Sequence, residues 1–133
     1  MRSYYYRIDE REKAPFILYR LKRGGSGNLS FMIIENRTAD EAYVYCEWGD
    51  IFNEMEDPQV FFGKDTIPEE NFVQFNNEDH YRFAARCYRS LLLREQITIR
   101  NRYNVVNQLF ADKKQKKNAL ILLEDYFKLV KKN

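Results

Sequence analysis

The architecture of this chain follows first from residues 16–35, FILYRLKRGGSGNLSFMIIE. The first run alternates, so that Ile17, Tyr19 and Leu21 lie on one side of an extended chain. A flexible glycine-rich turn at residues 24–28 then leads into a second β-prone run. The stretch therefore predicts a β-hairpin, and we expect Ile17, Tyr19 and Leu21 to form its core face.

The segments around this hairpin extend the pattern in both directions. Residues 2–8 alternate in the same way, which predicts three antiparallel strands within the first 36 residues. Further on, residues 38–41, TADE, match the S/T-x-x-E capping box and favour a helix over residues 39–55. The β-prone residues 43–46 favour a fourth strand instead. We expect the helix, with the strand as the alternative.

The second half of the chain has a mainly helical pattern. Residues 77–95 place apolar side chains in two adjacent rows of one helix face. Apolar residues then recur at spacings of four, three and four between Ile99 and Phe110, which predicts a second helix. Residues 113–118 form a polar connector, and residues 119–130 a third helix. This last helix is so apolar that we expect it to be central or covered by a partner, and a homodimer is compatible with it.

Together these patterns predict one α+β domain spanning residues 1–133. Its parts are a β-rich segment at 1–36, an acidic helix and long loop at 37–77, and a basic helical unit at 78–133. We expect an N-terminal antiparallel sheet of three strands, or of four if residues 41–48 join it. This sheet packs against three to four helices, the last three forming the C-terminal helical unit.

Charge is segregated along the chain into three blocks. Residues 1–23 carry seven Lys and Arg against three Asp and Glu, for +4. Residues 24–80 carry two against thirteen, for −11, and residues 81–133 carry thirteen against four, for +9. The blocks either neutralise one another within the fold or offer two distinct electrostatic surfaces to partners.

The composition points to a folded cytoplasmic protein. Of 133 residues, 44% are hydrophobic and 32% are charged, which suits a folded domain. No apolar run approaches the roughly 18 residues of a membrane-spanning helix, and the N-terminus lacks the apolar core of a signal peptide. We therefore expect no membrane contact. Cys46 and Cys87 form no CxxC pair, so we expect both to be reduced residues of the core.

No recognisable catalytic pattern emerges from the chemistry-bearing residues. The only histidine, His80, precedes Cys87 by seven residues, which separates them by about 10 Å along a helix and prevents direct pairing. A pair between His80 and Cys46 would depend on the fold. One His and two Cys do not supply a zinc site. We therefore expect no catalytic residue and no cofactor, although Asp50, Glu54 or their neighbours leave a metal-dependent enzyme as the third hypothesis.

Basic residues of the last block carry the second hypothesis, direct binding of a nucleic acid. Arginines at i, i+4 and i+7 of one helix face, with further arginines and a lysine cluster after them, can neutralise several phosphates. The alternative is that they pair with the acidic middle block, which would cancel the positive field that attracts a nucleic acid. The candidate residues are Arg82, Arg86, Arg89, Arg94, Arg100, Arg102, Lys113 and Lys114, followed by Lys116 and Lys117.

The acidic block carries the first hypothesis. We expect a small non-enzymatic binding protein, of adaptor or inhibitor type, that engages a protein or a protein–nucleic-acid assembly. Acidic residues would occupy a basic groove on the partner, and nearby aromatic residues would act as anchors. The candidate residues are Glu47, Asp50, Glu54, Asp57, Asp65 and Glu69, with the aromatic residues Trp48, Phe61 and Phe62.

Overall fold

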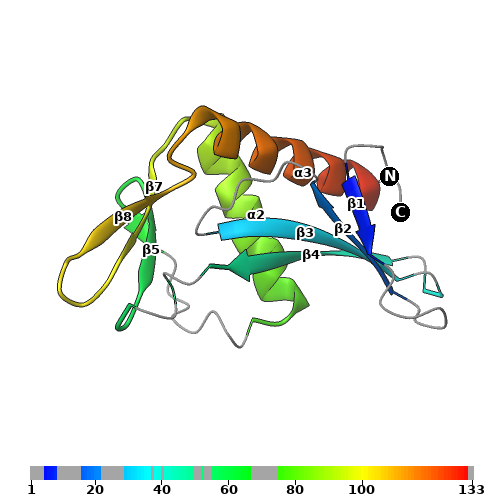
Figure 1. Ribbon diagram of the computed structural model, residues 1–133, viewed down its shortest axis with the longest axis horizontal. Coiled ribbons are helices and arrows are strands. Elements are labelled where there is room, and N and C mark those ends of the chain that lie inside the picture. The colour runs from blue at the N-terminus through cyan, green and yellow to red at the C-terminus, as the bar shows by residue number, and fades with distance from the viewer. Residues whose placement is uncertain are drawn as a thin grey trace.

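The computed structural model describes residues 5–8, 16–21, 29–36, 38–39, 41–49, 52, 55–66 and 75–131. Over these residues the chain forms two four-stranded antiparallel sheets and two helices (Figure 1), which confirms the α+β class. The first sheet has the order β1 (Tyr5–Ile8), β2 (Phe16–Leu21), β3 (Leu29–Asn36) and β4 (Glu41–Trp48). The second has the order β6 (Asp65–Thr66), β5 (Gln59–Phe62), β7 (Ile97–Arg100) and β8 (Val106–Leu109). The helices are α2 (Asn77–Leu92) and α3 (Lys113–Lys131).

The first sheet contains the hairpin predicted from residues 16–35. Strands β2 and β3 pair antiparallel, with Tyr19 opposite Ile33, and β1 pairs with the outer side of β2. Ile17 and Tyr19 are buried and Leu21 packs against the same core, which confirms the predicted inward face. The glycine-rich turn and residues 2–4 of the predicted first strand lie outside the described residues.

The helix predicted over residues 39–55 is wrong for its main part, because residues 41–48 form β4. Alternate residues of β4 lie on the inward face of the sheet, opposite the inward-facing residues of β3. They are Ala42, Val44, Cys46 and Trp48. Val44 and Cys46 are buried there. Eight paired positions with β3 and the burial of alternate side chains outweigh a four-residue capping match. The four-stranded alternative is therefore the correct one.

The second helix predicted between Ile99 and Phe110 is also wrong, because this stretch forms the β7–β8 hairpin. The turn is closed by Asn104 N–H, which donates to the Asn101 carbonyl at 3.1 Å. Asn104 has φ 61°, a left-handed conformation that asparagine adopts more readily than most residues. The Asn101 side chain accepts hydrogen bonds from the Tyr103 and Val105 amides, each at 2.9 Å. Local turn chemistry thus overrides the helical spacing.

Helix α2 confirms the prediction over residues 77–95, ending at Leu92. Asn76 caps it: its side chain accepts from Asp79 N–H at 2.8 Å, and the Asp79 carboxylate accepts from Asn76 N–H at 3.1 Å. The helix contacts β4 of the first sheet and β5 of the second. It therefore joins the two sheets, with Phe83 and Cys87 fully enclosed between them.

Helix α3 begins at Lys113, so the polar connector predicted over residues 113–118 is in fact its first turns. Asp112 caps this start by accepting from Gln115 N–H at 2.7 Å. The helix contacts β3, β4 and α2, and Leu122, Leu123 and Tyr126 are buried against them. Its apolar stripe is thus covered within the chain, as a central helix requires.

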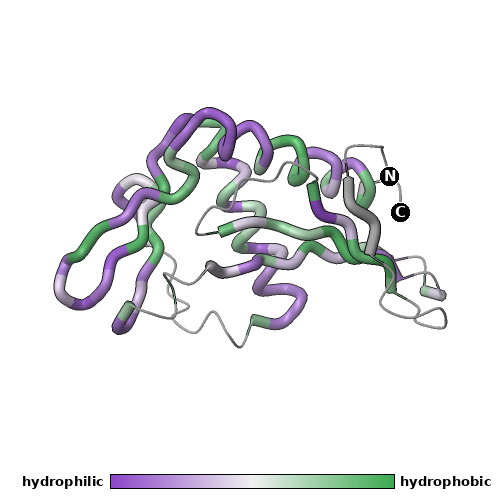
Figure 2. Tube along the Cα trace, in the orientation of Figure 1, coloured by the Kyte–Doolittle hydropathy of each residue, from purple (hydrophilic) through white to green (hydrophobic). Residues whose placement is uncertain are grey.

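One hydrophobic cluster includes residues of both sheets and both helices. Its aromatic part centres on Phe83, which packs edge-on against Trp48 at 4.9 Å and Phe62 at 5.7 Å. Figure 2 shows hydrophilic residues gathered on the amino-terminal turns of α3 and mainly apolar ones along β3. The described residues contain two helices, fewer than the three to four predicted, and neither is long and apolar enough to cross a membrane.

Candidate nucleic-acid interface

The carboxyl end of α2 and the amino end of α3 meet at one border of the molecule, the upper one in Figure 1. The β7–β8 hairpin connects the two ends, and the two helices are in contact. Six exposed basic residues belong to these ends, and we call them the basic border. They are Arg89, Arg94, Lys113, Lys114, Lys116 and Lys117.

The residues of the basic border have no ion-pair partner among the residues that the structure describes. The other candidate arginines near them do. Arg82 pairs with Asp79 at 2.7 Å, and Arg86 pairs with Glu95 at 3.2 Å and Asp65 at 3.6 Å. Ion pairing therefore separates the candidate cations into neutralised ones and a group whose charge is left to solvent or to a partner.

Two acids adjoin the border in sequence. The Asp112 carboxylate, beside Lys113, accepts from Gln115 N–H at 2.7 Å, and Glu95, beside Arg94, is also engaged. The Glu95 carboxylate accepts from the Ser90 hydroxyl at 2.9 Å and from the Arg86 guanidinium at 3.2 Å. These two hydrogen bonds, aided by the charges of Arg86 and Arg89, lower the pKa of Glu95. Glu95 is therefore ionised, and its ion pair is with Arg86 and not with a residue of the basic border.

Arg100 and Arg102, the remaining candidate arginines, lie on the second sheet and its hairpin. Arg102 pairs with Glu56, and with Asp57 at 3.7 Å. Arg100 lies over the ring of Phe61, with 4.5 Å between the guanidinium carbon and the ring centroid. Neither belongs to the basic border. The structure thus divides the predicted basic set into three groups: the basic border, the acid-paired Arg82 and Arg86 of α2, and Arg100 and Arg102 of the second sheet and its hairpin.

The described members of the predicted acidic surface do not form one patch. Glu47 pairs with Arg20 on the first sheet, Asp57 with Arg102 near the hairpin, and Asp65 with Arg86 on α2. These pairs match the alternative in which basic residues neutralise the middle block. Asp50, Glu54 and Glu69 lie outside the described residues.

The aromatic residues predicted as anchors are mostly internal. Phe62 has no exposed surface, and Trp48 packs against Phe52, Phe75 and Phe83 in the core. Phe61 is half-buried beneath Arg100. Trp48 and Phe61 are thus partly exposed, and Phe62 is not. Their hydrophobicity was the sequence feature that suggested anchors, and it reflects packing into the core in at least two cases.

His80 and Cys46 do meet in the fold, but in a structural arrangement. The Cys46 backbone N–H donates to His80 Nδ1 at 3.1 Å, and the Cys46 thiol lies 3.8 Å from the His80 carbonyl oxygen. Burial raises the pKa of the Cys46 thiol, and also that of Cys87. Both thiols are therefore neutral and poor nucleophiles. Within the described part of the chain, no group of three or more His, Cys, Asp or Glu is placed to hold a metal.

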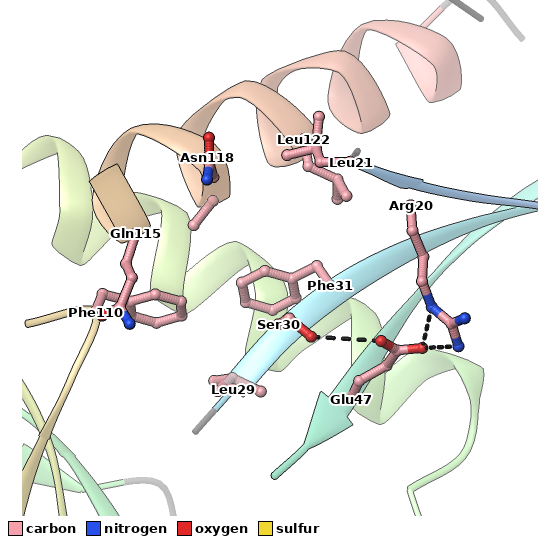
Figure 3. Close-up of a pocket in the computed structure, with 11 residues that line it drawn as sticks. Arg20, Leu21, Leu29, Ser30, Phe31, Glu47, Phe110, Gln115, Asn118 and Leu122 are labelled. Atoms are coloured by element: carbon pink, nitrogen blue, oxygen red, sulfur yellow. Dashed lines mark hydrogen bonds and ion pairs between the residues drawn. The ribbon is translucent and has the colours of Figure 1, made fainter. Parts of the chain in front are cut away.

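A pocket of about 120 Å³ lies between the ends of β2 and β3 and the first half of α3 (Figure 3). The rings of Phe31 and Phe110 stack beside it at 5.9 Å. Its charged groups, Arg20 and Glu47, bind each other, and Ser30 donates to Glu47 at 3.4 Å. The pocket is small beside the roughly 300 to 1,000 Å³ of typical ligand sites. Its charged groups are already satisfied by one another.

Sequence reasoning identified every residue of the basic border as a basic candidate but not the helix that carries its lysines. The missed feature is the cap formed by Asp112, directly before the lysine cluster, and Gln115, within it. The chain matches no family model, no curated protein and no solved structure. Functional inference therefore rests on the geometry of this chain.

Proposed function

We propose that this protein binds the phosphate backbone of a nucleic acid, free or within a protein–nucleic-acid assembly, through the basic border. The observation that supports this is the selective absence of ion-pair partners there. Among described residues, Arg82, Arg86 and Arg102 are each held by carboxylates, whereas the border residues are exposed and unpaired. Charges of this kind release counterions from a polyanion on binding, which supplies sequence-independent affinity.

The position of the lysines strengthens the proposal. Lys113 and Lys114 occupy the first turn of α3, which contains no acidic residue. The helix dipole already makes this end positive, so each lysine there costs the helix about 0.3–1 kcal/mol. The Asp112 and Gln115 side chains accept from backbone amides at this end, so the lysine side chains are the groups that would contact a phosphate. An anionic partner would turn this cost into binding energy.

Fluorescence anisotropy tests the proposal. Labelled single-stranded DNA, duplex DNA and RNA are titrated with the protein at low and near-physiological salt. We expect binding that weakens steeply with salt. In the variant with Lys113, Lys114, Lys116 and Lys117 changed to Gln, the slope of log K against log salt on duplex DNA should become shallower by roughly 0.9 for each phosphate that the protein no longer neutralises. Glutamine is chosen because it preserves helix propensity.

A matched pair of double variants provides the control. R89Q with R94Q removes two unpaired border charges, whereas R82Q with R102Q removes two charges that carboxylates already neutralise. The first pair should lower affinity much more than the second. Failure of the wild-type protein to bind any of the three nucleic acids at low salt would refute the proposal, as would equal decreases in affinity in the two double variants.

A protein partner is the second candidate, and one observation favours it. The face of the first sheet that points away from the core carries exposed aromatic residues, Phe16 and Tyr45. Between Phe16, Ile34 and Tyr43 it is hollowed by about 370 Å³. This aromatic surface, rather than Trp48 or Phe62, could then anchor a partner protein. Capture of a partner that is abolished in Y45D but retained when the border lysines are Gln would favour this candidate over nucleic-acid binding.

A further inference from the structure

Strand β8 forms an outer border of the second sheet, at the left of Figure 1. It pairs with β7 on one side, and its other side faces away from the sheet. A sheet border presents backbone N–H and C=O groups that another strand can use. Whether another strand can reach them depends on the side chains of the border and on the elements beside it.

The hydrogen bonds of the hairpin show which backbone groups of β8 point outward. Asn101 N–H donates to the Val105 carbonyl at 3.1 Å, so residues 101 and 105 form a hydrogen-bonded pair. Bonded and non-bonded pairs alternate along antiparallel strands. Asn107 and Leu109 are then bonded to β7, while the N–H and C=O groups of Val106 and Gln108 point away from it. These outward groups recur at every second residue.

The side chains of this border do nothing to repel another strand. Val105 is 53% exposed and Val106 is 49% exposed. Residues 105–110, VVNQLF, contain neither a charged residue nor a proline. Charge, proline and short length are the usual means by which sheet borders avoid pairing. The border at β8 has only its shortness.

Two other borders are protected. At β4, helix α2 packs against the strand and His80 Nδ1 accepts the outward N–H of Cys46. At β6 the strand is only two residues long and contains the exposed Asp65 beside Lys64. The contrast makes β8 the accessible one of these three borders.

We propose that β8 pairs with β8 of a second copy of this chain, antiparallel about a two-fold axis at Asn107. Because the outward groups of Val106 and Gln108 are two residues apart, Val106 falls opposite the second copy's Gln108, and Gln108 opposite the second copy's Val106. Both pairs are hydrogen-bonded, which gives four hydrogen bonds and one eight-stranded sheet. Val105 falls opposite the second copy's Leu109, and Asn107 faces its own copy.

A second copy is the occupant that suits this border, because the strand is complementary to itself. An uncharged strand meets its own copy without like-charge repulsion, and the spacing of its outward groups satisfies both chains at once. Four residues make a short contact, so the dimer is reversible and depends on concentration. This inference is independent of nucleic-acid binding, which uses other residues.

Sedimentation velocity over a series of protein concentrations measures the association. The wild-type sedimentation coefficient should rise with concentration from that of a monomer toward that of a dimer. In Q108P the proline removes an outward N–H and leaves the bonds to β7, so the protein should fold and remain monomeric. V106K, which places a charge at the same border, should also remain monomeric, while T66K at the β6 border should still dimerise.

Disulfide trapping tests the register. Facing residues of a non-bonded antiparallel pair have Cα atoms about 4.5 Å apart, within the range of a disulfide. N107C should therefore form a covalent dimer under mild oxidation, and T66C should not. The native Cys46 and Cys87 are buried and do not interfere. A wild-type protein that stays monomeric throughout, or association that persists in both Q108P and V106K, would overturn the proposal; equal cross-linking of N107C and T66C would overturn the register.

Discussion

The two helices differ in how their ends are charged. Helix α2 has Glu78 and Asp79 in its first turn and Arg89 in its last turn, which is the arrangement that the helix dipole favours. Helix α3 begins with Lys113 and Lys114 and has no acid in its first turn. Both helices are buried on their inner faces, with Phe83 and Leu123 almost without exposed surface. The difference is therefore one of surface charge and not of packing.

This difference teaches which helix end serves the fold and which one is available for function. The amino end of α2 is capped, acidic and in contact with β4, and its capping groups stabilise the folded chain. The amino end of α3 is capped by Asp112, yet its lysines oppose the dipole and meet no described carboxylate. Residues that cost stability without a structural return are those expected at binding surfaces.

The largest effect is expected at His80, which links α2 to the border of the first sheet. Replacement by Ala leaves the buried Cys46 N–H without an acceptor and should lower the free energy of unfolding by about 1–3 kcal/mol. His80→Asn retains an acceptor and should lose less. Chemical denaturation of the two variants beside the wild type measures both. Equal losses of stability in the two variants would show that ring packing, and not the hydrogen bond, holds this contact.

The same residue makes stability depend on pH. Burial lowers the pKa of His80 in the folded chain, with the charge of Asp79 opposing this in part. The facing groups from β4 are Tyr45, whose ring lies 4.4 Å away, and the neutral Cys46. Because the unfolded chain binds a proton first, near pH 6.5, stability is fully present above that pH and falls as pH decreases toward the lowered folded value. His80→Asn should be flat between pH 7 and about pH 5.5, which denaturation at stepped pH would reveal.

A smaller effect is expected at the cap of α2. Asn76→Ala removes the acceptor for Asp79 N–H and should destabilise the chain by about 1 kcal/mol. Asn76→Ser keeps a capping oxygen and should restore most of this loss. Thermal unfolding of the three proteins provides the measurement. If Ala and Ser variants unfold together, the cap contributes little and the contrast between the helix ends is weaker than proposed.

Parts of the fold could be predicted because their pattern is short-range and dominated by burial. The β2–β3 hairpin and helix α2 each have a period that matches their structure, and Ile17, Tyr19 and Phe83 lie inside as expected. Strand β4 could not be separated from a helix, because residues 38–41 satisfy a capping pattern while residues 42–48 alternate. Pairing with β3 resolves the choice, and that pairing is a tertiary contact.

The second sheet and the basic border were missed for related reasons. Spacings of four, three and four between Ile99 and Phe110 imitate a helix, and only the turn geometry of Asn101 and Asn104 shows a hairpin. Similarly, the basic residues are visible in the sequence, but which of them are neutralised depends on partners distant along the chain. Arg86 and Asp65 are 21 residues apart and still pair. Charge counts alone give no access to such contacts.

The smallest effect is a gain in stability, and it tests the comparison directly. Changing Lys113 and Lys114 to Glu places acids where the dipole of α3 favours them, so each should stabilise the helix by about 0.3–1 kcal/mol at low salt. The same change should abolish most of the affinity for nucleic acid, because it inverts two charges of the basic border. Lys128→Glu, which breaks the pair with Glu124 near the other end of α3, should lower stability slightly and leave binding nearly unchanged. Denaturation and anisotropy on the same samples separate the two effects. A double variant that is more stable and binds poorly would show that these lysines are kept for a partner, whereas one that is less stable would mean that they support the fold and that the contrast between the two helices has no functional meaning.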